Sequence, residues 1–296
     1  MGKVAVVDVL RRVLRRSPRR QAIIVLGMHR SGTSALTRVV SLLGATLPGN
    51  LLPATPDNET GYWESYDVLG LNKALLEAAG TSWYDDASIA DSWFATEATQ
   101  AFHSPARTFL EDAFHDSPFF VLKDPRFCRL LPFWLPLLED LGVSPRFLLI
   151  LRHPREVLRS LAARGKFEEM RQAAPSVPEQ SYLLWLRHVL EAERHTRGLR
   201  RAVVTYDGML ADWAATLSRV ASEAAISFPV SLADAIPAVD DFLSVEHRHH
   251  HESDDDGEAT PGAELAAEIY GLFAASAHQG VPLDTARLDV VRDALD

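Results

Sequence analysis

Residues 22–34 read AIIVLGMHRSGTS and combine the parts of a strand, a tight loop and a helix start. Five apolar residues, rich in β-branched types, stop abruptly at Gly27, which is typical of a central parallel strand. Gly27 and Gly32 bracket a short polar loop, after which an apolar helical pattern opens at Thr33 and ends at Gly44. Such a unit directs backbone N–H groups and the positive end of a helix at one point, so the sequence predicts an anion site there.

The residues inside this loop restrict which anion it binds. The spacing from Gly27 to Gly32 is that of a nucleotide-binding P-loop, but Thr33 and Ser34 follow where the nucleoside triphosphate version has Lys and Ser/Thr. The cation is Arg30, inside the loop. This arrangement argues against ordinary ATP or GTP chemistry; a turn without a ligand is the structural alternative.

Two later apolar runs also end in charged residues. Residues 119–122 lead into Lys-Asp-Pro-Arg at 123–126, and residues 147–151 lead into Arg152, with Ser160 about two helical turns further on. Ligands in open parallel sheets bind beyond the carboxyl ends of the strands. We therefore expect these polar residues in one crevice with the glycine loop, where the Arg152 guanidinium is suited to a phosphate.

These motifs, taken together and in this order, resemble a known family. Residues 28–34, MHRSGTS, resemble the 5′-phosphosulfate loop of sulfotransferases that use 3′-phosphoadenosine 5′-phosphosulfate (PAPS). Arg152, with Pro two residues on and Ser160 beyond, resembles the family's 3′-phosphate motif. The run KDPR at 123–126 resembles bacterial members, and the resemblance covers most of residues 23–209.

The resemblance implies PAPS as donor, adenosine 3′,5′-bisphosphate (PAP) as product and no metal. The residues that it assigns to donor binding are His29, Arg30, Ser31, Gly32, Thr33, Ser34, Arg152, Ser160, Tyr206 and Arg248. Among these, Arg30 would also offset charge on the bridging oxygen as it breaks, and Lys123 could neutralise the transferring sulfuryl group. For Tyr206 a place in the core is the alternative, and for Arg248 a solvated loop.

A carboxylate is expected to accept the acceptor's proton. In several branches of the family a Glu at this distance past the loop is the general base, and Glu59 and Glu64 are the candidates. We favour Glu64, because the aromatic residues before it would desolvate the carboxylate and raise its pKa. A solvated loop carboxylate is the alternative. Asp124 is the rival base, unless it only forms an ion pair with Arg126.

Composition sets further limits on function. The chain has 296 residues and a net charge of −10, which disfavours a general nucleic-acid binder. Cys128 is the only cysteine, so no intrachain disulfide can form, and we expect it to serve packing. No apolar run has membrane-spanning length, which favours a soluble cytoplasmic protein. Residues 4–16 form a basic amphipathic pattern that either packs on the domain or touches an anionic membrane surface.

The predicted fold is one α/β domain over residues 21–296, after a basic extension at 1–20. We expect three layers, α/β/α, around a parallel sheet of four or five strands, P-loop NTPase-like, with a C-terminal helical extension. The remaining helical patterns lie at residues 67–79, 95–116, 130–141, 179–197, 207–223, 232–242, 261–277 and 284–295. The His- and Asp-rich residues 247–256 allow a metal site or a solvated loop as alternatives.

The predicted reaction is transfer of a sulfuryl group from PAPS to a hydroxyl of a small-molecule, glycan or glycolipid acceptor. Loops at 45–66 and 165–178 are expected to select that acceptor. Two rival hypotheses stay open: a P-loop kinase that uses ATP and magnesium, and a non-catalytic nucleotide-binding protein of the same fold.

Overall fold

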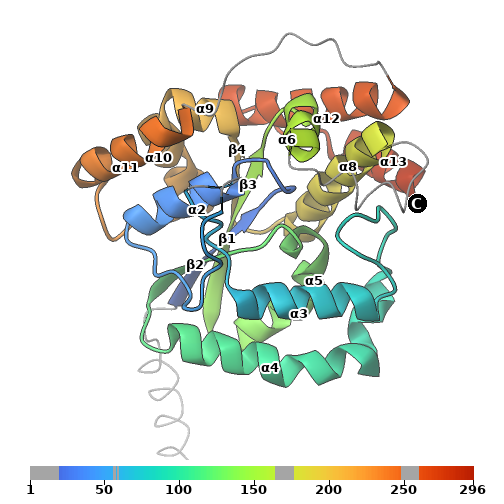
Figure 1. Ribbon diagram of the computed structural model, residues 1–296, viewed down its shortest axis with the longest axis horizontal. Helices are drawn as coiled ribbons and strands as arrows, with labels where there is room; N and C mark the ends of the chain where they lie inside the picture. The colour runs from blue at the N-terminus through green and yellow to red at the C-terminus, as the bar shows by residue number, and fades with distance from the viewer. Residues whose placement is uncertain (1–19, 56–57, 59, 164–176, 248–259) are drawn as a thin grey trace, which may run out of the picture.

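Four parallel strands form the centre of the part of the chain that the structure describes. The computed structural model describes residues 20–55, 58, 60–163, 177–247 and 260–296 (Figure 1). The strands are β1 (Arg20–Leu26), β2 (Phe119–Lys123), β3 (Val143–Leu151) and β4 (Arg201–Thr205). Their order in the sheet is β2-β1-β3-β4, and each neighbouring pair is parallel. The glycine loop, which follows β1, therefore leaves the sheet between two strands whose carboxyl ends point the same way.

Alternating side chains of β1 serve two separate hydrophobic clusters. Ile24 belongs to one cluster, together with its register partners Leu122 and Phe147. Ile23 and Val25 belong to the other cluster, on the opposite face. Successive side chains of a strand point to opposite faces, so a strand covered on both sides reads as a continuous apolar run. The apolar run of the sequence thus already indicated a sheet buried on both faces.

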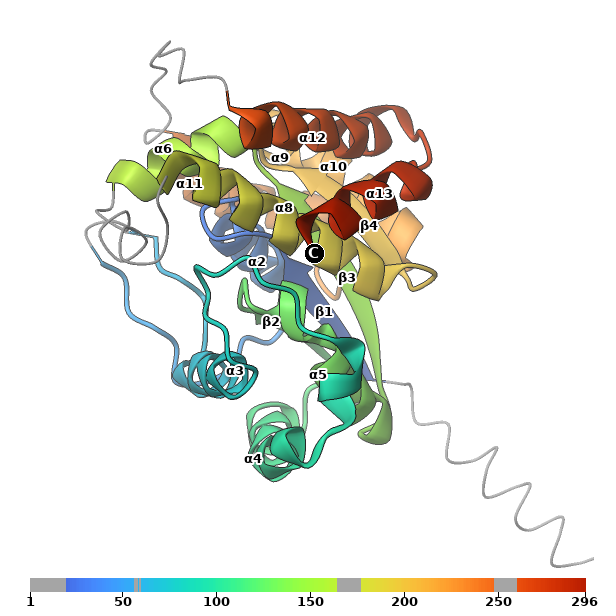
Figure 2. The ribbon, with the colours of Figure 1, turned by 90° about the vertical axis from the view of Figure 1, so that its right-hand side faces the viewer.

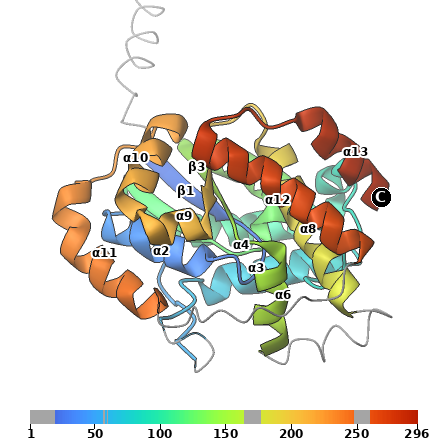
Figure 3. The ribbon, with the colours of Figure 1, turned by 90° about the horizontal axis from the view of Figure 1, so that it is seen from above.

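Helices cover both faces of the sheet. The helices around the first cluster are α3 (Tyr66–Ala78), α4 (Glu97–Phe114), α5 (Phe127–Asp140), α6 (Pro154–Ala163), α8 (Val177–Thr196), α12 (Pro261–Gln279) and α13 (Thr285–Leu295). The helices around the second cluster are α2 (Thr33–Leu42), α9 (Tyr206–Ala211), α10 (Trp213–Ala224) and α11 (Leu232–His247), which Figures 1 and 3 show grouped together. A short 3₁₀ helix, η1 (Asp91–Ala95), precedes α4. The predicted three-layer α/β fold is confirmed.

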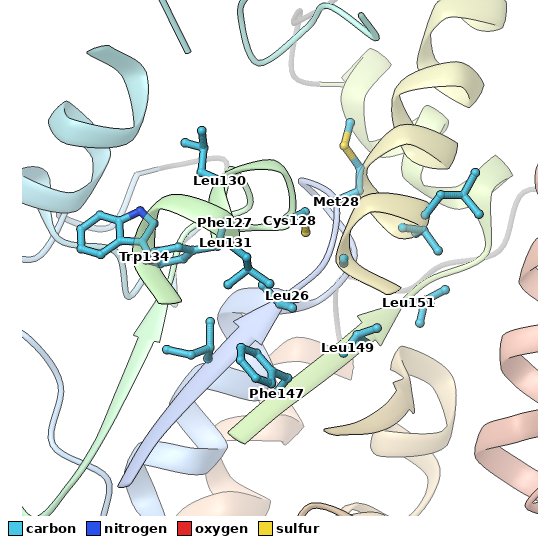
Figure 4. Close-up of a cluster of buried hydrophobic side chains, with 14 of the residues drawn as sticks. Leu26, Met28, Phe127, Cys128, Leu130, Leu131, Trp134, Phe147, Leu149 and Leu151 are labelled. Atoms are coloured by element: carbon cyan, nitrogen blue, oxygen red, sulfur yellow. The ribbon is translucent and has the colours of Figure 1, made fainter. Parts of the chain in front are cut away.

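The first cluster extends from the sheet up to the glycine loop. Figure 4 shows Leu26 and Met28, on either side of Gly27, among side chains of α5 such as Cys128 and Trp134. Met28 is fully buried, which anchors the loop in the core although its neighbours are polar. The C-terminal helices α12 and α13 lie along α8 (Figure 2) and complete the same layer.

Local signals explain where the helices differ from the predicted ones. The pattern at 207–223 is divided into α9 and α10, because Asp212 leaves the helical conformation and its side chain accepts a hydrogen bond from the N–H of Ala215. An Asp in this role is a typical N-cap. The predicted helix at 4–16 lies outside the described residues, and no described helix is both long and apolar enough to cross a membrane.

Candidate functional site

The glycine loop, residues 27–32, needs glycine at both ends. Gly32 caps α2 in the left-handed conformation, with φ of +86°, and a Cβ there would overlap the ring of Tyr206. A Cβ at Gly27 would overlap the carbonyl oxygen of Ile150 on β3. Arg30 also has a positive φ of 71°, which is uncommon for a residue with a side chain. The backbone is therefore strained at Arg30. A simple connection between a strand and a helix does not require such strain.

The loop presents unpaired polar atoms beside the start of α2. The hydroxyl of Ser31 and Nε2 of His29 are buried and have no hydrogen-bond partner among the described residues. The first N–H groups of any helix lack intrahelical acceptors, and the helix dipole adds partial positive charge there. A buried polar atom without a partner is costly, so a ligand that hydrogen-bonds to it binds favourably. The Ser31 hydroxyl and the first N–H groups of α2 are donors that an anion needs.

Arg30 connects the loop to α6. Its Nε–H donates a 2.7 Å hydrogen bond to the hydroxyl oxygen of Ser160. The two residues were predicted to hold different ends of one nucleotide, and the fold brings them together across a large sequence separation.

Arg152 directly follows β3 and lies over the ring of Tyr206. Its guanidinium is 5.2 Å from the centre of the Tyr206 ring, and its Nε–H donates a 2.6 Å hydrogen bond to Glu156. Because the same ring lies against Gly32, Tyr206 connects the glycine loop with Arg152. Tyr206 is 3% exposed, so it occupies a core position and also contacts the candidate site through Gly32 and Arg152.

A second group of predicted residues meets at the end of β2. The Lys123 ammonium donates hydrogen bonds to Oε1 of Glu64 at 2.6 Å and to the hydroxyl oxygen of Ser34 at 3.1 Å. The Ser34 hydroxyl in turn donates to the carbonyl oxygen of Tyr62 at 3.2 Å. The ion pair of Lys123 and Glu64 is buried. Burial raises the pKa of Glu64 more than the Lys123 charge lowers it, as expected for a carboxyl group removed from water.

Asp124 has a structural partner of its own. Its carboxylate is fully buried and accepts hydrogen bonds from the backbone N–H and the guanidinium of Arg126, at 2.8 and 3.1 Å. This is the geometry of the ion pair that fixes the turn after β2, which is the alternative to a role as base.

Cys128 lies beneath the glycine loop, in the first turn of α5. The N–H of Gly27 donates to its sulfur at 3.2 Å, and burial raises the pKa of the thiol to about 12. A thiol that stays protonated is a poor nucleophile, so this geometry agrees with the expected packing role.

The sequence did not predict the two residues whose rings lie against His29 of the glycine loop, Trp83 and His188. The ring of His29 lies 5.0 Å from that of Trp83 and 6.2 Å from that of His188, measured between centroids. Burial, and next the charge of Arg126, hold the pKa of His29 well below its ordinary value, so the ring is neutral at pH 7. Trp83 lies in an irregular segment without periodicity, and His188 lies within the helical pattern of α8, so only the tertiary contacts identify either residue.

Some predicted residues cannot be placed. Glu59, Arg248 and most of the His- and Asp-rich residues 247–256 lie outside the described residues, as do residues 165–176 of the predicted acceptor loop. Within the described residues, no group of three or more His, Cys, Asp or Glu is arranged to hold a metal ion.

The chain is similar to known proteins in structure and in sequence. Sulfotransferase STF9 from Mycobacterium avium is similar in structure, with a TM-score of 0.50 and 15% identity over 90% of this chain and 80% of that one. The sulfotransferase domain from the curacin biosynthetic pathway has a TM-score of 0.48 and 16% identity over 84% of this chain and 96% of that domain. A comparison with curated protein sequences found no match. A sequence model described as "Sulfotransferase family" matches residues 22–229, a span that contains every site residue placed above. The chain therefore belongs to the sulfotransferase family.

Proposed function

We propose that this protein transfers a sulfuryl group from PAPS to a hydroxyl group of a small-molecule, glycan or glycolipid acceptor. The observation that supports it most is the convergence of Arg30, Ser160, Arg152 and Tyr206 on the strained glycine loop. Two cationic side chains, Arg30 within the glycine loop and Arg152 after β3, suit a donor with two phosphate-type groups.

In the proposed complex, the glycine loop and the start of α2 bind the 5′-phosphosulfate. The unpartnered Ser31 hydroxyl and the N–H groups at the start of α2 supply hydrogen bonds without any rearrangement of the core. Arg152 and Ser160 bind the 3′-phosphate. In that complex Arg152 exchanges part of its pairing with Glu156 for the phosphate, since both are partly exposed and lie at the surface.

The proposed step is an in-line displacement at sulfur. The acceptor oxygen forms a bond to sulfur while the bond from sulfur to the bridging oxygen breaks, and the electron pair leaves with the phosphate of PAP. Glu64 takes the hydroxyl proton of the acceptor. Lys123 and Arg30 stabilise the charge that develops on the sulfuryl and bridging oxygens. The protein acts through positioning and fixed charge, as in phosphoryl transfer.

Glu64 suits the role of base better than Asp124. Its raised pKa makes it a stronger proton acceptor than an ordinary carboxylate, and Lys123 fixes it at the end of β2 beside Ser34. The carboxylate of Asp124 is committed to the backbone and side chain of Arg126.

Conversion of PAPS to PAP in the presence of candidate hydroxyl acceptors tests this proposal. We expect acceptor-dependent PAP release and transfer of labelled sulfur to the acceptor, both unaffected by EDTA. Turnover of ATP that requires magnesium, with PAPS inert, would contradict the proposal and favour a kinase. Tight binding of PAPS without any transfer would favour a non-catalytic nucleotide-binding protein.

A further inference from the structure

The segment of residues 81–87, between α3 and η1, lies against His29 of the glycine loop. Trp83 lies in this segment, is partly exposed, and meets the His29 ring edge to face. Tyr84 packs against Trp83 at 5.5 Å between ring centres. Arg30 and Arg152, which the proposed function assigns to the donor, instead contact Ser160 of α6 and the Tyr206 ring, respectively.

A buried arginine holds this segment in place. Arg129 of α5 is 2% exposed, and its guanidinium donates to the carbonyl oxygens of Ser82, Asp85 and Ala87 at 2.8, 2.9 and 2.6 Å. It also donates to the Thr81 hydroxyl at 3.2 Å. Burial lowers the pKa of Arg129 to about 10, so the group is still charged at neutral pH. A buried charge satisfied almost wholly by the carbonyls of one segment is a costly arrangement that fixes the backbone conformation of that segment.

A second buried arginine adds to this support. The Nε–H of Arg187 on α8 donates to the carbonyl oxygen of Asp86 at 2.7 Å. The next residue, His188, is fully buried, and its Nδ1 lies 2.8 Å from the carbonyl oxygen of Leu184. That contact requires a proton on Nδ1, which leaves Nε2 as an acceptor, and this atom has no partner among the described residues. His29 Nε2, close by, is also unpartnered within the described part of the chain.

We propose that Trp83 selects the acceptor by stacking on a flat ring that carries the hydroxyl group, and that Arg129 positions Trp83 for this contact. The inference rests on the proposed function, because it identifies the acceptor side of that same site. A Trp side chain held in place beside an imidazole of the glycine loop is suited to a ring with an apolar face and a polar edge. Phenols and sugars both have such a face, whereas an alkyl chain does not.

Binding of acceptor probes to the PAP complex tests the role of Trp83. The probes are 2-naphthol, methyl β-D-glucopyranoside and 1-octanol, titrated calorimetrically into protein saturated with PAP. We expect one of the two ring compounds to bind better than 1-octanol, and Trp83→Leu to weaken that binding about tenfold while Trp83→Phe retains most of it. Trp93→Leu is the matched control, because Trp93 lies on η1 and packs against Phe94.

The positioning role of Arg129 is tested by comparing how its variants bind the ring compound and how they bind PAP. Arg129→Met is expected to weaken binding of the ring compound as much as Trp83→Leu, and to leave PAP affinity within about twofold, with Arg129→Lys restoring part of the loss. If Arg129→Met weakens binding of PAP and of the ring compound equally, a general loss of folding explains the result and the positioning role is overturned. The Trp83 variants then still test the contact between Trp83 and the acceptor ring.

The outcomes distinguish this inference from the proposed function. If the protein binds PAP, and Trp83→Leu and Trp93→Leu bind the ring compound with equal affinity, the inference is overturned and the proposed function is not. Preferred binding of 1-octanol would overturn it as well. Failure of the wild-type protein to bind PAP would instead contradict the proposed function.

Discussion

Glu64 and Cys128 are both buried beside the glycine loop, yet their chemistry differs because their neighbours differ. Glu64 has a cationic partner 2.6 Å away and a raised pKa, whereas the Cys128 thiol accepts one N–H and lies in an apolar layer. A carboxylate in the first environment is a stronger proton acceptor than an ordinary carboxylate, whereas a thiol in the second stays protonated. Replacement of either side chain therefore tests a specific part of the account.

Glu64→Gln keeps the shape of the side chain and removes the proton acceptor. We expect kcat to fall roughly a hundredfold or more, with PAP affinity unchanged. A base works only when deprotonated, so wild-type kcat/KM is lost as the pH falls through the Glu64 pKa, which lies above the ordinary carboxyl value. The variant should lack this acid limb. Glu77→Gln, at an exposed ion pair on α3, is the control, and an unchanged pH profile in Glu64→Gln would exclude Glu64 as the base.

Cys128→Ala removes the sulfur beneath Gly27. We expect kcat with PAPS to stay within about twofold of wild type, because a thiol of such high pKa supplies no thiolate. Loss of the buried thiol should lower the free energy of unfolding by about 1 kcal/mol, measured by urea denaturation. A variant that folds but does not turn over would indicate a covalent role for the thiol.

Among the structural elements, the turn from β1 into α2 carries the strictest sequence requirement. Gly32→Ala would place a Cβ against the Tyr206 ring at a φ of +86°, where a side chain is strained by about 1–2 kcal/mol before the ring moves. We expect a lower free energy of unfolding and weaker PAP binding. Gly70→Ala is the matched control: nothing lies within 4 Å of its Cβ in α3, so helix propensity should stabilise it by about 0.5–1 kcal/mol. Equal stability of the two variants would contradict the assigned role of Gly32.

The sequence was most informative where local chemistry determines an element. The apolar run of β1, the glycines of the loop and the charged strand ends at Lys123 and Arg152 could be predicted because strand burial and turn geometry depend on neighbouring residues. These positions include most of the donor side of the candidate site.

The proposed acceptor side could not be predicted for a physical reason. Trp83 meets His29 in a segment whose backbone carbonyls accept hydrogen bonds from Arg129 and Arg187 on other helices. Nothing in the neighbouring sequence of either residue indicates this contact, since it depends on how α3, α5 and α8 pack. The pairing of Glu64 with Lys123 likewise joins a loop to a strand that follows much later in the chain.

In the molecule as a whole, both layers of helices contribute residues to the candidate site at the carboxyl ends of the strands. The second cluster contributes α2 and Tyr206, and the first contributes α5, α6 and α8. A ligand that contacts both layers stabilises the folded state in proportion to its affinity, because it has no such site in the unfolded chain. Binding of the correct donor should therefore be visible as a change in the unfolding transition of the whole protein.

The most direct test is the shift of the melting temperature with PAP, compared with ATP–Mg²⁺ and AMP, in wild type and in Arg152→Ala. At a PAP concentration about a hundredfold above Kd we expect a rise of roughly 5 °C in the wild type, and smaller shifts with the other two nucleotides. Arg152→Ala should lose most of the PAP shift, while Arg155→Ala, at an exposed position of α6, should retain it. Stabilisation by ATP–Mg²⁺ with PAP inert, or an undiminished PAP shift in Arg152→Ala, would contradict the proposed donor site.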